Sequence, residues 1–517
     1  MKHFSESKNS MIQSAVNEYM AQKAAPATPT AEADAPRLFA AAPAMAKVFA
    51  PAAAPAAAPT PALAGQPAAG DAPAPTQPAT PQAAHEQINL LNTVLESASN
   101  NRVAEAPHAN FFERAVAWVE HKYQQTKQAI THSDAIEAYS ILEEYVTALL
   151  AGNTELAHEK AVELKGTAYS EADPNWAKSM ITWFNTYKVE MKTPRYTAWK
   201  SLDDFAYRLP PTTSGTLRVG LIGDWGTGEP SAVKVLTNLF ALKPDIIIHL
   251  GDIYYSGTRH EYDTKYHAVI EQARQASGQH VPVYNLPGNH DYYSGGEGFY
   301  NSLPLVNSTT KPGTPVQEAS YFALFNDYWQ LQGMDTGFND NNVLEVNRDT
   351  TRLKDEEVTW HQHQLDKAVA AGRKIILLSH HQLFSRYEAI DDDTYNQKLL
   401  ANFKPYIDKQ QISSWFWGHE HVAAIYKPTL GLAKGRCIGN SAVPLFYQTG
   451  TAYKVLQSLR GQPVTNLPDV EFDPAQFSHD GTFYAQGFAL LELKADKTGT
   501  AAYYTTADPK PFYTETL

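Results

Sequence analysis

The distribution of hydrophobic residues divides the 517-residue chain into three stretches of different character. Residues 1–84 are dominated by Ala and Pro and contain almost no aromatic side chains. Because Pro breaks helices and Ala buries little apolar surface, this N-terminal segment is predicted to be largely disordered. In residues 85–200 hydrophobic side chains recur at helical spacing, which predicts a small helical region. Beyond it, short apolar runs alternate with amphipathic stretches.

That alternation predicts layers of strands and helices over residues 210–517. Strands are expected at 217–222, 245–250, 281–286, 374–378 and 412–417, and helices at 231–242, 262–275 and 355–371. Residues 487–494 and 500–505 alternate as a β-hairpin does. The predicted class is therefore α/β. In such sheets ligands bind beyond the carboxyl ends of the strands, so the residues that follow the strands are the candidates for chemistry.

Composition and charge narrow the possible functions. The formal charge is −13 and no basic run offsets it, so a nucleic-acid scaffold is not expected. A single cysteine, Cys437, excludes an internal disulfide. No apolar run is long enough for a transmembrane helix, and the first 23 residues lack the pattern of a signal peptide. Localisation thus stays open between the cytoplasm and export by a nonclassical route, and no protein partner can be named.

Polar side chains follow five of the predicted strands. The segments are Gly223-Asp224-Trp225-Gly226, Gly251-Asp252-Ile253-Tyr254-Tyr255, Gly288-Asn289-His290-Asp291, Ser379-His380-His381 and Gly418-His419-Glu420-His421. A single Gly-Asp after a strand is usually only a turn. Five such segments in order would bring Asp, Tyr, Asn and His side chains to one sheet edge. These ligand types suit Fe, Mn or Zn, and the set contains no thiolate.

The order of these segments resembles the calcineurin-like metallophosphoesterases and, within them, the purple acid phosphatases. Those enzymes have the pattern GDxG, GDxxY, GNH(D/E), xxH and GHxH, which this chain matches over about residues 217–505. Most metallophosphoesterases begin with Asp-x-His, but Gly226 stands where that His would be and Tyr255 is present in the second segment. The resemblance implies a four-layer α/β/β/α sandwich, preceded by the helical region and the Ala/Pro-rich segment.

The resemblance also implies a binuclear metal centre. One metal would be held by Asp224, Asp252, Tyr255 and His421, and the other by Asp252 as a shared bridge with Asn289, His380 and His419. Two carboxylates and a phenolate favour Fe(III) at the first position. One shared carboxylate with neutral ligands suits a divalent Fe, Zn or Mn ion at the second.

Catalytic roles follow from the same comparison. Two adjacent metal ions would lower the pKa of a bound water, and the resulting hydroxide would attack phosphorus. His290 is the candidate for protonating the leaving group, with Asp291 orienting it, although His290 could instead only contact phosphate. Asn289 and His381 are candidate substrate-binding residues, and for His381 a supporting or solvent-facing role is the alternative.

The leading functional hypothesis is hydrolysis of small phosphate monoesters by an acid phosphatase-like enzyme. A phosphodiesterase or nucleotide hydrolase would use the same metal chemistry, because the motifs specify phosphorus and not the leaving group. A non-catalytic binding protein on the same fold is the third hypothesis. Metal content separates the third from the other two, and a monoester compared with a diester separates the first from the second.

Overall fold

The computed structural model describes residues 190–517 with short gaps, and a few residues before them. The gaps are 311–312, 343–350, 446, 448–452, 454, 460, 473–475 and 481–482, and the earlier residues are 179, 182–183 and 186–187. The N-terminal segment 1–84 lies outside the described residues, as does nearly all of the helical region 85–200. Both stay predictions. The last residues of that region, 191–199, contain no helix or strand.

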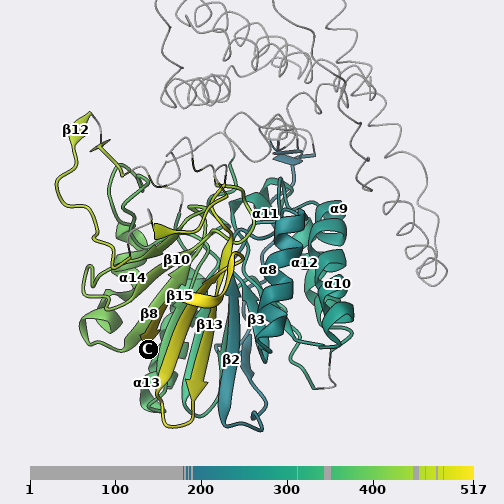
Figure 1. The fold of residues 1–517 in the computed structure, drawn as a ribbon. Coiled ribbons are helices and arrows are strands. Elements are labelled where there is room, and N and C mark those ends of the chain that lie inside the picture. The colour runs from purple at the N-terminus through teal and green to yellow at the C-terminus, as the bar shows by residue number, and fades with distance from the viewer. Residues whose placement is uncertain are drawn as a thin grey trace, which may run out of the picture. The chain divides into compact units, whose positions relative to one another are not determined.

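Two mixed β-sheets form the centre of the described part (Figure 1). The six-stranded sheet has the order β15-β14-β13-β2-β3-β4. Its strands are β2 (Thr216–Ile222), β3 (Ile246–His249), β4 (Val283–Asn285), β13 (Gly487–Lys494), β14 (Gly499–Thr505) and β15 (Asp508–Thr516). Strands β2, β3 and β4 are parallel, and β13 pairs antiparallel with β2.

The seven-stranded sheet has the order β1-β5-β6-β7-β8-β10-β9. Its strands are β1 (Ala206–Arg208), β5 (Phe322–Phe325), β6 (Trp329–Gly333), β7 (Lys374–Leu378), β8 (Ile412–Trp417), β9 (Ala423–Ile425) and β10 (Gly435–Ile438). Strands β6, β7, β8 and β10 run parallel. A separate pair, β11 (Ser458–Leu459) and β12 (Gln462–Pro463), forms a short hairpin.

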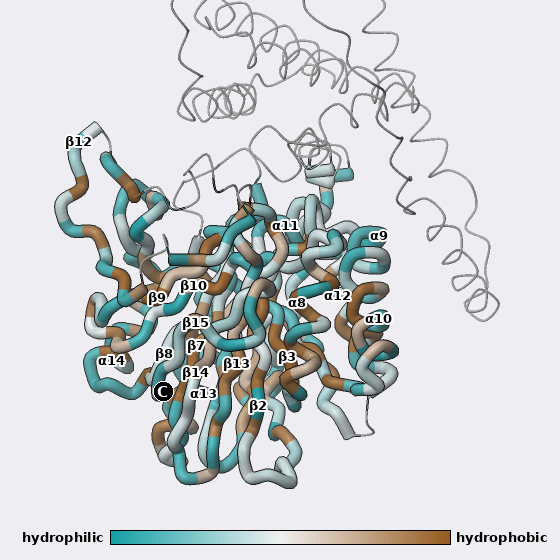
Figure 2. The backbone as a smooth tube through the Cα atoms, viewed as in Figure 1, coloured by the Kyte–Doolittle hydropathy of each residue, from teal (hydrophilic) through white to brown (hydrophobic). Residues whose placement is uncertain are grey.

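Successive residues of a strand point to opposite faces of its sheet. In the described residues the strands therefore contribute to one hydrophobic core between the two sheets and to one on the outer face of each sheet. Ile248 of β3 and Ile376 of β7 belong to the core between the sheets. Their neighbours Ile247 and Ile375 pack on the outer faces instead. Figure 2 shows hydrophobic positions concentrated on these strands and on the helices that cover them, with largely hydrophilic loops.

Helices cover both outer faces and complete four layers. On the six-stranded sheet lie α8 (Pro230–Ala241), the π-helix η4 (Tyr262–His267), α10 (Ala268–Ser277) and α12 (Glu297–Val306). The short helices α9 (Arg259–Glu261) and α11 (Asn289–Tyr293) contact α12. On the seven-stranded sheet lie α13 (Asp355–Ala370) and α14 (Gln397–Asp408). Figure 1 shows α8, α10 and α12 on the right and α14 on the left. The α/β fold class predicted from the sequence is confirmed.

Among the described residues, no helix is both long and apolar enough to cross a membrane.

Candidate metal centre

The two sheets bring different ligand types to one edge of the sandwich. Oxygen ligands follow three strands of the six-stranded sheet: Asp224 after β2, Asp252 after β3 and Asn289 after β4. Imidazoles follow two strands of the seven-stranded sheet: His380 after β7, and His419 and His421 after β8. Hydrogen bonds join the sets, since the His419 amide donates to Asp224 Oδ2 at 2.7 Å. The structure thus brings these six predicted residues together.

The backbone at this edge is held in an uncommon conformation. The φ angles of Asp224, Asp252, His419 and His421 are 55°, 74°, 69° and 53°. A positive φ costs on the order of 1 kcal/mol for a residue other than glycine, and such residues cluster at functional sites. The close approach of Gly288 adds a further constraint, because a Cβ there would lie 2.0 Å from Asp252 Oδ1.

Asp252 lies at the centre of the cluster and is fully buried. Its Oδ1 accepts a hydrogen bond from the His290 amide at 3.1 Å. Its Oδ2 has no hydrogen-bond partner and lies 3.5 Å from His380 Nε2. Burial raises the pKa of Asp252 to about 7. A buried carboxylate oxygen without a donor is costly, and a cation at this position would remove that cost.

The atoms around Asp252 Oδ2 are further acceptors. His380 Nδ1 lies 2.9 Å from the Leu250 carbonyl oxygen, so that nitrogen carries the proton and Nε2 presents its lone pair. This lone pair lies 3.1 Å from Asn289 Oδ1, whose amide is oriented by donating from Nδ2 to the Tyr293 hydroxyl at 2.8 Å. These hydrogen-bond acceptors face one another without a proton between them. Their lone pairs are the electron-pair donors that a metal ion requires.

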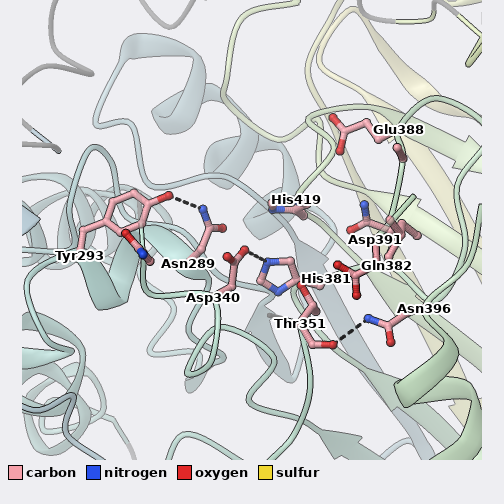
Figure 3. A pocket seen from close by; sticks show the side chains of 13 residues that line it. Asn289, Tyr293, Asp340, Thr351, His381, Gln382, Glu388, Asp391, Asn396 and His419 are labelled. Atoms are coloured by element: carbon pink, nitrogen blue, oxygen red, sulfur yellow. Dashed lines mark hydrogen bonds and ion pairs between the residues drawn. The ribbon is translucent and has the colours of Figure 1, made fainter. Parts of the chain in front are cut away.

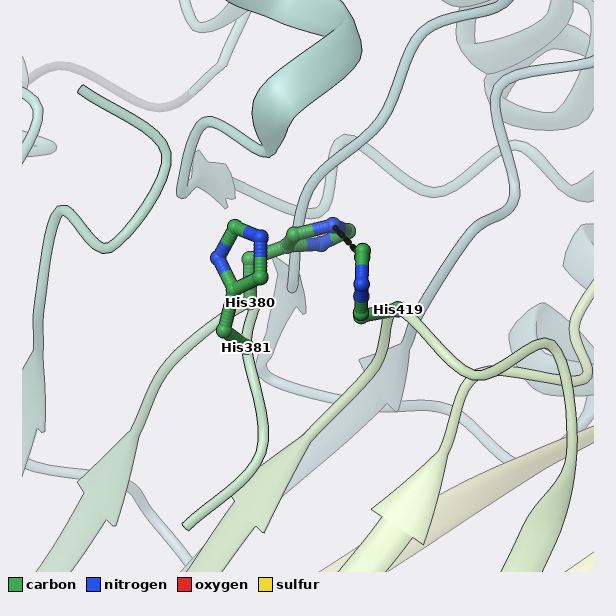
Figure 4. Close-up of side chains that lie close together, drawn as sticks. All are labelled: His380, His381 and His419. Carbon is green, nitrogen blue, oxygen red and sulfur yellow. Dashed lines mark hydrogen bonds between the residues drawn. The ribbon is translucent and has the colours of Figure 1, made fainter. Parts of the chain in front are cut away.

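Three histidines of the cluster, His380, His419 and His421, are neutral. Burial lowers the pKa of His380 and His419 well below the usual value, and that of His421 to about 3. His380, His381 and His419 lie close together, as do Asp224, Asp252 and His380, with ligand atoms of each group within 4.8 Å of one another. Figure 4 shows the three imidazoles, with the 3.2 Å contact between His380 and His419. Neutral imidazole is the form that binds metals.

The structure places a different tyrosine at the cluster from the one predicted. The hydroxyl of Tyr254 donates to Asp224 Oδ1 at 2.9 Å and lies 2.8 Å from His421 Nε2. The Tyr255 ring instead lies beside Lys265, whose ammonium is 4.9 Å from the ring centroid. The residues after Asp252 form turns and not a strand, so their spacing does not determine which side chain faces Asp224.

His290 lies beside the Asp252 carboxylate, but Asp291 does not orient it in the predicted way. His290 Nδ1 lies 2.7 Å from the Tyr255 carbonyl oxygen, and its Nε2 is 3.8 Å from Asp252 Oδ2. The Asp291 carboxylate instead accepts from the amides of Asp252 and Gly288, at 3.0 and 2.7 Å. Asp291 therefore shapes the backbone around Asp252, and the carbonyl group of Tyr255 takes the predicted role of orienting the imidazole.

His381 borders a pocket next to the cluster (Figure 3). Its Nε2 lies 2.9 Å from Asp340 Oδ2, and its Nδ1 lies 3.0 Å from the Thr336 hydroxyl. Asn289 and His419 line the same pocket. The two residues predicted to bind substrate, Asn289 and His381, therefore both face it. Thr336 and Asp340 were missed at the sequence level because they lie in a loop after β6 that carries no recognisable motif.

Residues 217–423 match the calcineurin-like phosphoesterases. The resemblance to this family that the sequence predicts is thereby confirmed over these residues. No curated protein sequence is significantly similar to the chain.

The fold is similar to several solved structures. A purple acid phosphatase from yellow lupin (Lupinus luteus) seeds has 15% identity and a TM-score of 0.36, over 60% of this chain and 54% of that one. A dimetal phosphatase from Danio rerio has 13% identity and a TM-score of 0.38, over 58% and 98%. GAP50, the anchor in the inner membrane complex of Plasmodium, has 13% identity and a TM-score of 0.38, over 58% and 88%. This chain thus spans about half of the lupin enzyme.

Proposed function

We propose that the protein hydrolyses phosphate monoesters at a binuclear metal centre of the purple acid phosphatase type. The observation that carries the proposal is the buried Asp252 Oδ2, which has no hydrogen-bond partner and faces the lone pair of His380. A carboxylate left unpaired inside a protein is unfavourable unless it serves an ion or a reaction. The surrounding oxygen and imidazole ligands, without any thiolate, fit Fe, Zn or Mn.

Two sets of residues would hold the metals, with Asp252 in both. One set comprises Asp224, Asp252, His421 and a tyrosine, and the other comprises Asp252, Asn289, His380 and His419. Two carboxylates and a phenolate in the first set favour Fe(III), whereas the second set suits a divalent Fe, Zn or Mn ion. The bound ions would supply Lewis acidity toward phosphate and a water nucleophile that is active near neutral pH.

The protein's own groups would then position the ester and manage the proton. His290 is fixed through Nδ1 by the Tyr255 carbonyl group, and its Nε2 is on the side of Asp252. Burial lowers the pKa of His290 to about 4, and its Nδ1 faces a carbonyl oxygen, so Nε2 presents a lone pair in the free protein. The negative charge of a bound phosphate would favour uptake of a proton at Nε2, and that proton would pass to the alkoxide as the ester bond breaks. Asn289 and His381 face the pocket from the same side and would bind the substrate there.

The test of the proposed function uses the full-length protein and measures bound metals together with ester hydrolysis. We expect two metal equivalents per chain and faster hydrolysis of p-nitrophenyl phosphate than of bis(p-nitrophenyl) phosphate. Faster hydrolysis of the diester would favour the phosphodiesterase hypothesis. A chain that binds no metal and hydrolyses neither ester would be a binding protein on a phosphoesterase fold.

The tyrosine ligand can be identified by its colour. A phenolate bound to Fe(III) gives a visible charge-transfer band, and the geometry places the Tyr254 hydroxyl beside Asp224 and His421. We therefore expect the band to disappear in Tyr254→Phe and to persist in Tyr255→Phe, as measured by absorption spectra of iron-loaded proteins. The reverse result would restore the sequence-based assignment to Tyr255. A colourless wild-type protein containing divalent metals would remove the purple acid phosphatase label and keep the phosphoesterase.

A further inference from the structure

The pocket beside the proposed centre is large enough for a small leaving group. Its cavity volume is about 80 Å³, and it is open to solvent on one side. Its inner end is formed by Asn289, His381 and His419, which adjoin the cluster around Asp252 (Figure 3). A phosphate bound at the centre would therefore direct its ester group into this pocket, so the lining determines which alcohols fit.

Negative charge dominates among the described residues that line this pocket. Three carboxylates contribute to it: Asp340 from the loop after β6, and Glu388 and Asp391 from the segment between β7 and α14. The other described lining residues are neutral or apolar apart from the two histidines, and none is Lys or Arg. Such a pocket favours a cationic group and disfavours a second phosphate or a carboxylate on the leaving group.

A buried hydrogen-bond acceptor in the lining indicates the same type of ligand. Gln382 is only 5% exposed, and its Oε1 has no hydrogen-bond partner. It follows His380 and His381 directly in the chain and borders the pocket. A buried amide oxygen requires a donor, and a primary ammonium group offers three.

We propose that the enzyme prefers phosphate monoesters of amino alcohols, of which phosphoethanolamine is the simplest. The inference rests on the proposed function and names its substrate class. In the reaction, water attacks phosphorus, the bond between phosphorus and the ester oxygen breaks, and the leaving oxygen takes a proton. The products are inorganic phosphate and the amino alcohol. The ammonium group keeps its charge throughout, and the carboxylates of Glu388 and Asp391 attract it, whereas Asp340 already contacts His381.

The test compares phosphoethanolamine with propyl phosphate, in which a methyl group replaces the ammonium group at nearly the same size. For the metal-loaded full-length protein we expect kcat/KM to be at least about tenfold higher for phosphoethanolamine. A tenfold difference corresponds to about 1.4 kcal/mol, which the attraction between one pair of opposite charges in a protein pocket can supply. Phosphoglycolate, with a carboxylate on its leaving group, should be hydrolysed more slowly than propyl phosphate.

Two variants test whether the pocket carboxylates cause the preference. Asp391→Asn and Glu388→Gln should each reduce the ratio of the two kcat/KM values by roughly threefold or more. Asn tolerates the positive φ of 51° at position 391, so that substitution keeps the backbone. The matched control is Asp392→Asn. Asp392 follows Asp391 in the chain and carries the same charge, but it is exposed to solvent and does not line the pocket. The control should keep the wild-type ratio.

The outcomes distinguish this inference from the proposed function. Equal or faster hydrolysis of propyl phosphate overturns the preference for amino alcohols but keeps the phosphatase. A ratio that is unchanged in both pocket variants, or that falls equally in Asp392→Asn, overturns the role of the pocket carboxylates. Failure to hydrolyse any monoester, p-nitrophenyl phosphate included, overturns the proposed function and the inference with it.

Discussion

Replacing Asp252 by Asn is expected to remove both the bound metals and the activity. Asp252 belongs to both proposed ligand sets, so one substitution weakens both positions. The amide keeps the size of the side chain but loses the charge on Oδ2, which has no other partner. We expect kcat/KM to fall by at least about 10²–10³-fold, the loss typical when one charge-stabilising group is removed. Elemental analysis and p-nitrophenyl phosphate hydrolysis measure the two effects.

Stability distinguishes this specific loss from simple unfolding. Burial raises the pKa of Asp252 from its ordinary value of 3.8 to about 7, so the cost of its charge to the metal-free protein grows between these two pH values and is complete above pH 7. Asp252→Asn should therefore unfold at the same or a higher temperature than metal-free wild type at pH 8. Asp263→Asn, on the exposed side of η4, is the control and should leave metal content and rate unchanged. Normal metal content in Asp252→Asn would contradict the shared position.

His290→Ala is expected to lose turnover and keep its metals. The side chain is removed, but the backbone amide that donates to Asp252 Oδ1 remains. If His290 protonates the leaving group, kcat should fall about 10²–10⁴-fold for an alkyl ester. The fall should be much smaller for p-nitrophenyl phosphate, because p-nitrophenolate departs without a proton. Steady-state kinetics with propyl phosphate and p-nitrophenyl phosphate measure this difference.

The comparison of the two esters decides between the roles considered for His290. Equal losses for both esters would mean that His290 only contacts phosphate, and loss of metal would make it a ligand. His363→Ala is the control, because this partly exposed histidine lies on α13 and contacts Asp203. That variant should match wild type with both substrates.

The elements that the sequence predicts well are those with continuous apolar runs. Both β7 and β8 begin and end at the predicted residues, because Ile376 and Leu377, for example, pack into cores on opposite faces of the sheet. Strand β15 was not predicted, since all of its residues are exposed or half-buried and it pairs only with β14. The predicted helix at 262–275 begins as the π-helix η4, a change of winding that periodicity does not reveal.

At the candidate site, residue types and strand ends were predictable, whereas side-chain directions were not. The positions of Tyr254 and Tyr255 in the sequence do not predict which of them faces Asp224, because the conformation of the loop determines which side chain points there. Likewise, Asp291 is next to His290 in sequence but accepts hydrogen bonds from backbone amides. Asp340 contacts His381 from 41 residues away in the chain, and no local pattern indicates such a contact.

The division of ligands between the sheets has a consequence for how the protein matures. The six-stranded sheet provides carboxylate and amide oxygens, and the seven-stranded sheet provides imidazoles. Either half alone would offer only part of the ligand set and would bind metal weakly. The proposed metal centre would therefore form only after the two sheets have packed together. Hydrolytic activity at the proposed centre would thus depend on completion of the fold.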